Sequence, residues 1–159
     1  MPGITKGEIV RALDISRRVI SLTAAVTLNL QAHAGKVLLL NAVAGFTVTL
    51  PDADGTGAIY HFRVQAVLTS NTYVVQVANS TDQMVGTILN IDTDTADNAE
   101  GFQADAVANA DTFPMNATTQ GGLYRGDWVE FMDAEADLWY VRGQLSGSGD
   151  LATNFTAAV

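Results

Sequence analysis

The sequence predicts an all-β protein, an antiparallel sandwich or barrel, and two observations support this prediction. Apolar and polar side chains alternate in residues 46–50 and 60–64, which is the period of a strand with one buried face. Turn residues, as in the run 51–57, interrupt such segments at short intervals, which is typical of sandwiches and barrels.

The first half of the chain is expected to form strands joined as hairpins. The pairs Ala34-Gly35 and Ala44-Gly45 suit tight turns between neighbouring strands, and Pro51 ends a strand because it has no N–H to donate. Strands are predicted at residues 19–23, 26–30, 36–41, 46–50, 58–66, 72–78 and 83–91.

The second half begins with an acidic segment, residues 92–111, which holds six carboxylates and no basic residue. It is predicted to be a surface loop with a short strand around Phe102. Strands are then predicted at 112–116, 127–133 and 138–143, and residues 133–137 form a polar hairpin loop between the last two.

Three parts of the chain are expected: an N-terminal arm over 1–18, a β-sandwich body over 19–145, and a short tail over 146–159. The Gly/Ser sequence of 146–150 predicts a flexible tether. It leads to a last strand that pairs in this subunit or on a neighbour.

The chain is acidic, with a net charge of −9, which argues against binding to the phosphate backbone of nucleic acids. It has no cysteine, so packing alone must hold the fold, and no apolar run suits a signal peptide or a membrane span. A soluble protein is therefore predicted.

The basic residues are unevenly placed. Lys6, Arg11, Arg17 and Arg18 are half of all Lys and Arg residues, and none lies between Arg63 and Arg125. Two interpretations remain open: a chance placement of solvated charges, or a basic arm that reaches an acidic neighbour such as another copy of the chain.

The acidic loop suggests a calcium site, because Asp92, Asp94 and Asp97 supply hard oxygen ligands. The spacing departs from an EF-hand loop, which needs Gly at its sixth position and Glu at its twelfth, where this chain has Asp97 and Gln103. A solvated loop is the favoured interpretation. Asp52 and Asp54 are interpreted as turn residues, so no metal or cofactor is expected.

No catalytic arrangement is expected. His33 and His61 are the only histidines, and neither lies in a nucleophile motif. His61 alternates with apolar neighbours, so its side chain is predicted to face solvent or pair across the sheet. Gly55-Thr56-Gly57 is interpreted as a turn, since neither a lysine nor a helix follows it. A glycosidase with paired carboxylates stays open, because many acidic residues always offer pairs.

Aromatic residues concentrate in the last third of the chain. Trp128, Trp139 and Tyr140 could stack on sugar rings, as in a carbohydrate-binding module. Core packing is the favoured interpretation, because aromatics supply large buried areas in small β domains.

Several strand and turn segments beyond Lys36 follow a recognisable order. The first lies within residues 37–62 and reads Leu-Asn-Ala-Val-Ala-Gly-Phe-Thr-Val-Thr-Leu-Pro, followed by an Asp/Gly/Thr turn. The others are residues 69–77, 121–127 and 139–143. Together they resemble segments of small virion proteins of tailed bacteriophages, and most of all head decoration, or cement, proteins.

This resemblance implies a non-enzymatic protein with a jelly-roll-like sandwich, which decorates the outer capsid surface and stabilises the head by bridging major capsid protein subunits. It also implies a homotrimer at local threefold positions of the virion, and the host cytoplasm during assembly. No nucleic acid or membrane partner is expected. The residues expected to contact the capsid or a neighbouring subunit are Lys6, Arg11, Arg17, Arg18 and Phe155.

Two alternatives come from other classes of protein. One is a structural component of a phage tail or fibre, which would enter tails instead of heads. The other is a carbohydrate-binding module, in which Trp128→Ala or Trp139→Ala would abolish glycan binding without loss of folding.

Overall fold

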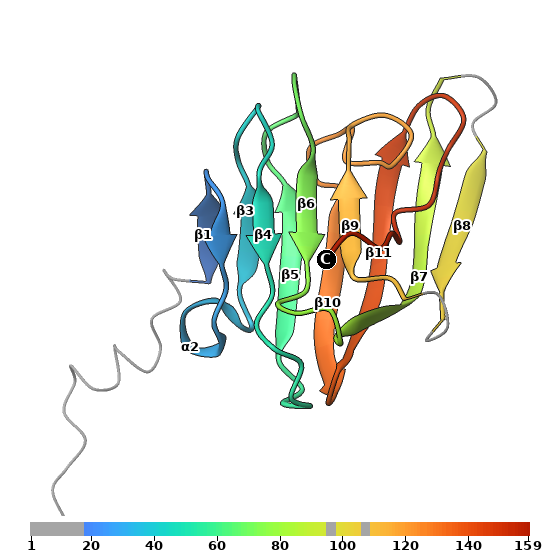
Figure 1. Ribbon diagram of the computed structural model, residues 1–159. Coiled ribbons are helices and arrows are strands. Elements are labelled where there is room, and N and C mark those ends of the chain that lie inside the picture. The colour runs from blue at the N-terminus through green and yellow to red at the C-terminus, as the bar shows by residue number, and fades with distance from the viewer. Residues whose placement is uncertain (1–17, 95–97, 106–108) are drawn as a thin grey trace, which may run out of the picture.

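The computed structural model describes residues 18–94, 98–105 and 109–159, which form two facing β-sheets (Figure 1). Sheet A contains, in spatial order, β1 (Val19–Leu22), β3 (Val37–Leu40), β5 (Ile59–Val64), β10 (Trp128–Glu135), β11 (Leu138–Gly147), β7 (Gln83–Asp92) and β8 (Ala99–Ala104). Sheet B contains β2 (Val26–Thr27), β4 (Thr47–Thr49), β6 (Tyr73–Gln76) and β9 (Thr112–Met115). The predicted all-β class is confirmed.

The first six strands alternate between the two sheets, so consecutive strands do not pair. β1, β3 and β5 are parallel neighbours in sheet A, and β2, β4 and β6 are parallel neighbours in sheet B. The prediction of antiparallel hairpins is therefore wrong for this half. Ala34-Gly35 and Ala44-Gly45 connect strands of different sheets, and side-chain alternation identifies a strand without identifying its partner.

The later strands complete sheet A and make it a mixed sheet. β10 and β11 form an antiparallel hairpin, as predicted, in which β10 is antiparallel to β5 while β11 is parallel to β7. β7 and β8 form a second antiparallel pair. Within the described ranges the end strands of each sheet do not pair with each other, so neither sheet closes into a barrel.

A short helix follows β2, where the sequence predicts that the strand continues to residue 30. Asn29 accepts a hydrogen bond from the backbone N–H of Ala32 at 2.8 Å and so caps helix α2 (Leu30–His33). Among the described residues, no helix has the length and apolar character that a membrane span requires.

The core lies between the sheets and is rich in aromatic rings. Phe62 of β5, Phe131 of β10, Phe113 of β9 and Phe155 pack edge to face in sequence, with centroid distances of 5.7, 5.6 and 5.5 Å. Trp139 of β11 is fully buried in the same core. Core packing, the favoured interpretation of the aromatic residues, is therefore correct for Trp139.

The C-terminal segment packs against its own chain. Ser146 and Gly147 belong to β11 and therefore do not form a flexible tether. Thr156 makes an isolated antiparallel bridge to Thr112 of β9, and Asn154 is fully buried. The predicted last strand is thus reduced to one bridge, which continues the layer of sheet B over the inner face of sheet A (Figure 1).

The acidic segment 92–111 contains β8, which includes Phe102 and confirms the short strand predicted there. Asp111, at its end, is buried, and its side chain accepts hydrogen bonds from the hydroxyl of Thr112 and from the backbone N–H of Ala158, which replace those to water.

Candidate functional site

The outer face of sheet A is open to solvent across its middle strands. Sheet B and the C-terminal segment cover the inner face, and no other described element covers the outer one (Figure 1). Because every second side chain points outward, the strand register aligns these side chains in rows that cross the sheet.

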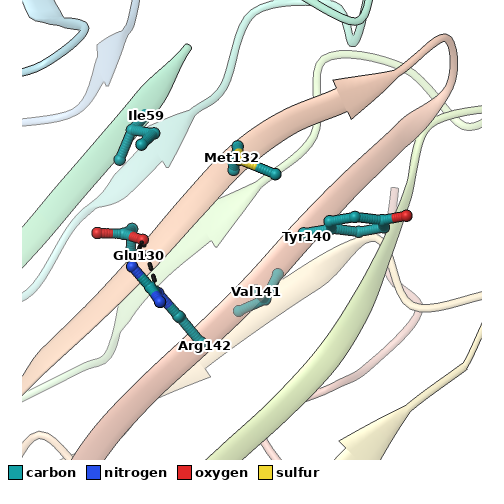
Figure 2. Close-up of a pocket in the computed structure, with 6 residues that line it drawn as sticks. All are labelled: Ile59, Glu130, Met132, Tyr140, Val141 and Arg142. Atoms are coloured by element: carbon teal, nitrogen blue, oxygen red, sulfur yellow. Dashed lines mark hydrogen bonds and ion pairs between the residues drawn. The ribbon is translucent and has the colours of Figure 1, made fainter. Parts of the chain in front are cut away.

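One row, which we call the apolar row, consists of Ile59 on β5, Met132 on β10 and Tyr140 on β11. Figure 2 shows these side chains on three adjacent strands, beside Glu130 and Arg142. Together with Val141 these residues line a depression of about 290 Å³. Tyr140 is 48% exposed and Ile59 is 37% exposed, so the row offers apolar area to a partner.

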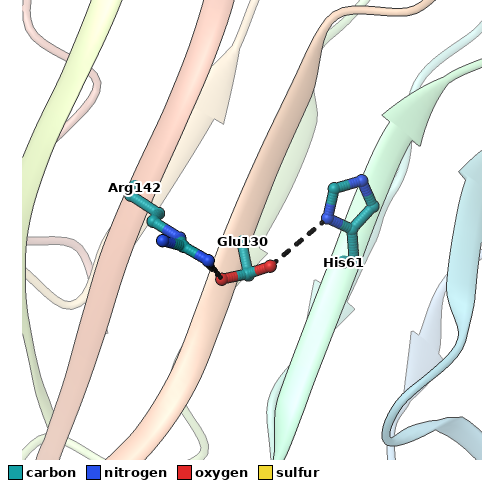
Figure 3. A network of polar contacts seen from close by, with 3 residues as sticks. All are labelled: His61, Glu130 and Arg142. Atoms are coloured by element: carbon teal, nitrogen blue, oxygen red, sulfur yellow. Dashed lines mark hydrogen bonds and ion pairs between the residues drawn. The ribbon is translucent and has the colours of Figure 1, made fainter.

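The adjacent row, which we call the ionic row, consists of His61 on β5, Glu130 on β10 and Arg142 on β11. Arg142 donates from Nε to Glu130 Oε1 at 2.7 Å, and its Nη2 lies 2.7 Å from the same oxygen. His61 Nδ1 lies 3.5 Å from the other carboxylate oxygen, Oε2 (Figure 3). Glu130 is thus held between two side chains, and the guanidinium remains largely exposed.

Trp128 on β10 fixes the other side of the histidine. Its indole stacks on the imidazole of His61, with ring centroids 5.5 Å apart and an angle of 15° between planes. Of the two arrangements predicted for His61, facing solvent or pairing across the sheet, the structure shows the pairing. The stack and the ionic contact together restrict the rotamers of Trp128, His61 and Glu130.

This arrangement suits binding to another protein surface. Apolar side chains around a shallow depression supply buried area, and a guanidinium held by a carboxylate is already oriented to donate hydrogen bonds. Because Glu130 limits the movement of Arg142, less side-chain entropy is lost on binding.

Buried carboxylates form a second polar feature, inside the molecule. Burial raises the pKa of Asp82 and of Asp127, and their hydrogen bonds, such as those from Ala53 and Ser146, offset this only in part. Burial also acts to raise the pKa of Asp133. Hydrogen bonds from Thr56 and Gly55 outweigh it there and hold the pKa of this carboxyl below its ordinary value.

These carboxylates position loops. Asp133 accepts hydrogen bonds from the backbone of Gly55 and Thr56, which fixes the 55–57 turn against β10. Asp127 accepts from the backbone and hydroxyl of Ser146, at 2.8 and 3.0 Å, which joins the start of β10 to the end of β11. The turn interpretation of Gly55-Thr56-Gly57 therefore agrees with the structure.

The basic residues expected to contact the capsid or a neighbouring subunit are not brought together by the described structure. Lys6, Arg11 and Arg17 lie outside the described residues, and Arg18 is exposed directly before β1. Phe155 is only 8% exposed and packs on Phe113, so its side chain contributes to the core of its own chain.

The candidate metal ligands also have structural partners. Asp94 accepts a hydrogen bond from the backbone N–H of Gly149 at 2.7 Å, and Asp92 accepts one from the backbone of Asp94. Asp97 lies outside the described residues. Within the part of the chain that the structure describes, no group of three or more His, Asp or Glu side chains is placed to hold a metal ion.

Sequence reasoning missed Glu130, Arg142 and the apolar row. The alternation of β10 and β11 was visible, and it placed Glu130, Met132, Tyr140 and Arg142 on one face. The missing information was that β5 lies beside β10, which brings Ile59 and His61 to the same surface.

Comparison with known proteins adds no relative. The chain matches no protein-family model, no curated protein and no solved structure.

Proposed function

We propose that this chain is a non-enzymatic virion protein of a tailed bacteriophage, which decorates the outer capsid surface and stabilises the head by bridging major capsid protein subunits. It binds the capsid through the apolar and ionic rows on the outer face of sheet A. It acts in the virion as a homotrimer and is present in the host cytoplasm during assembly.

The observation that carries this proposal is the open outer face of sheet A. Exposed apolar side chains, Ile59 and Tyr140 among them, adjoin a guanidinium that is already held by Glu130. A surface of this kind suits a rigid contact with a repeated protein lattice, because the sheet holds the contact residues in fixed positions.

The resemblance of residues 37–62, 69–77, 121–127 and 139–143 to head decoration proteins supplies the identity of the partner. The proposal does not depend on the jelly-roll connectivity that the resemblance also implies. The basic residues Lys6, Arg11, Arg17 and Arg18 provide a second contact, through their charge, with the capsid or a neighbouring subunit.

The test is a saturation-binding measurement on capsid shells that lack the protein. Tyr140→Ser removes an exposed ring from the apolar row, and we expect it to weaken binding about tenfold, or about 1.4 kcal/mol. Tyr124→Ser is the matched control, because Tyr124 is 53% exposed and lies in the loop before β10. Equal affinity of the two variants would contradict the assignment of the surface.

Purified tails are included in the same measurement to address the first alternative. Binding to tails but not to shells would favour a tail or fibre component. The carbohydrate-binding alternative loses one proposed residue, since the fully buried Trp139 offers no face to a sugar ring. A glycan-array measurement with Trp128→Ala tests what remains of that alternative.

A further inference from the structure

Among the described residues, those at one end of the molecule carry almost no charge. In a chain with a net charge of −9, residues 19–51 contain no carboxylate and a single Lys or Arg residue, Lys36. This stretch includes β1, β2, β3 and β4, which form the side of the molecule where both sheets end. We call the surface formed by β1, β2 and α2 the neutral end.

One side of the β1 backbone has no partner strand among the described residues. In the described part of the chain β1 pairs with β3 alone, and β2 pairs with β4 alone. The carbonyl oxygens of Arg18 and Leu22 accept hydrogen bonds from the β3 side, at 2.8 and 2.9 Å. Because a ladder uses alternate residues, the N–H and C=O groups of Val19 and Ser21 point away from β3, toward a further strand.

Apolar side chains surround this open edge. Val19 is 54% exposed and Leu30 of α2 is 51% exposed. Ile20 and Val26 pack against the core but remain only partly buried. The hydrophobic core therefore continues to the neutral end, where the described residues leave it partly uncovered.

We infer that the neutral end is the surface through which this chain binds a second copy of itself, with the backbone groups of Val19 and Ser21 hydrogen-bonded to the neighbouring copy. Two copies with a net charge of −9 repel each other, and contact through the neutral end keeps their carboxylates apart.

This surface is separate from the capsid-binding rows. The apolar and ionic rows lie on β5, β10 and β11, in the middle of sheet A, whereas β1 is its end strand. The inference deepens the proposed function, because it rests on the homotrimer proposed there and assigns its contact to the neutral end. A monomeric chain would remove both the inference and the homotrimer, whereas the measurement on capsid shells tests the apolar and ionic rows separately.

The experiment measures the mass of the full chain by light scattering and sedimentation over a wide concentration range. Ser21→Pro removes an N–H that the β1–β3 ladder does not use, so it blocks pairing with a second copy while the ladder stays intact. It also removes the exposed hydrogen bond that Asn41 Nδ2 donates to Ser21 Oγ, so urea unfolding of this variant accompanies the mass measurement. We expect this variant to weaken self-association about tenfold or more.

Gln103→Pro is the matched control on the opposite edge of sheet A. The backbone N–H of Asp92 donates to the carbonyl oxygen of Asn98, so Asn98 and every second residue after it face β7. Gln103 is out of phase with this set, so its N–H points away from β7. A second pair of variants replaces exposed side chains: Val19→Lys at the neutral end, and Leu89→Lys on β7, where Leu89 is 40% exposed.

Self-association that Ser21→Pro and Val19→Lys weaken, while Gln103→Pro and Leu89→Lys leave it unchanged, supports the inference. A native chain that stays monomeric overturns it, as does self-association that neither β1 variant weakens. A monomer whose Val19 and Ser21 amides are protected from hydrogen exchange also overturns it, because residues of the same chain would then cover the edge.

Discussion

Asp133 binds Thr56 through two atoms of that residue. The backbone N–H and the hydroxyl of Thr56 both donate to Asp133 Oδ2, at 3.0 and 2.5 Å, and the N–H of Gly55 donates to Oδ1 at 2.7 Å. The carboxylate is only 3% exposed, so each of its hydrogen bonds is made away from water.

Asp133→Asn is therefore expected to destabilise the protein by about 2 to 3 kcal/mol at neutral pH, because an amide group would turn N–H donors toward the donors of the 55–57 turn. Urea unfolding measures the change. Asp137→Asn is the control, since Asp137 is exposed in the same hairpin. Equal destabilisation by both variants would contradict a special role for Asp133.

The two buried carboxylates Asp133 and Asp127 are predicted to respond to pH in opposite ways. The pKa of Asp133 is lowered, so its contribution to stability is present above the ordinary pKa of Asp and is lost as pH falls through the folded pKa. The destabilisation caused by Asp133→Asn should therefore shrink in acid.

The pKa of Asp127 is raised by burial, so its ionised form is disfavoured in the folded state. As pH falls toward the ordinary pKa of Asp, the native chain binds this proton before the unfolded chain does and gains stability. The destabilisation caused by Asp127→Asn should therefore grow over that interval. Unfolding free energies measured between about pH 7 and 3 test both signs, and parallel profiles for the two variants would refute the prediction.

Gly86 on β7 faces the backbone of β11 and has a φ of +146°. A Cβ atom there would overlap the carbonyl oxygen of Val141. We expect Gly86→Ala to destabilise the protein by about 3 kcal/mol or more, because the two strands would have to separate.

Gly101→Ala on β8 is the control for this substitution. The nearest atom to a Cβ at Gly101 is the carbonyl oxygen of Ile88, at 4.0 Å, which is an ordinary contact. Thermal unfolding of both variants is the measurement. A Gly86→Ala variant as stable as Gly101→Ala would contradict the close approach of β7 to the backbone of β11.

Phe155 was expected from the sequence to contact a neighbour, whereas the structure packs it on Phe113. Phe155→Ala should therefore act on folding, with a loss of about 3 to 5 kcal/mol from the cavity it leaves. Val159→Ala, at a residue that is 42% exposed, should be nearly neutral. Capsid affinity per folded molecule should stay unchanged in both variants, and a Phe155→Ala chain of native stability with weakened attachment would restore the contact role.

Capsid attachment is predicted to depend on the basic residues that precede β1. Replacement of Lys6, Arg11, Arg17 and Arg18 by Gln removes four positive charges, and attachment should weaken and lose most of its salt dependence. Deletion of residues 1–18 should likewise leave the β body folded and weaken attachment. Binding isotherms at low and high salt are the measurement, and native affinity in both altered chains would remove the arm from the binding model.

Local features of the fold were predictable, and pairings between distant segments were not. Alternation in residues 46–50 and 60–64 identified strands β4 and β5, because one buried face imposes a period of two whatever the partner strand is. The parallel pairing of β3 with β5 depends on contacts between residues 24 positions apart in the chain, such as Val37 with His61. The local sequence does not encode such contacts.

The candidate site illustrates the same limit. His61 was predicted either to face solvent or to pair across the sheet, because its phase is opposite to that of Phe62. The partner Glu130 became known only from the register of β5 with β10. Asp133 was expected in a polar loop, because a carboxylate in a turn-rich segment is usually solvated. Its buried carboxylate accepts hydrogen bonds from Thr56 and Gly55 in place of water, and these donors are more than seventy residues away in the chain.

The strand order of sheet A has a consequence for synthesis of the chain. β10 and β11 are translated after the other strands of both sheets, yet they lie between β5 and β7 in sheet A. Leu138 pairs with Gln83, which is translated 55 residues earlier. We therefore expect the emerging chain to expose unpaired edges of β5 and β7 until the final hairpin inserts, so that folding is slow and premature pairing between nascent chains is its main hazard.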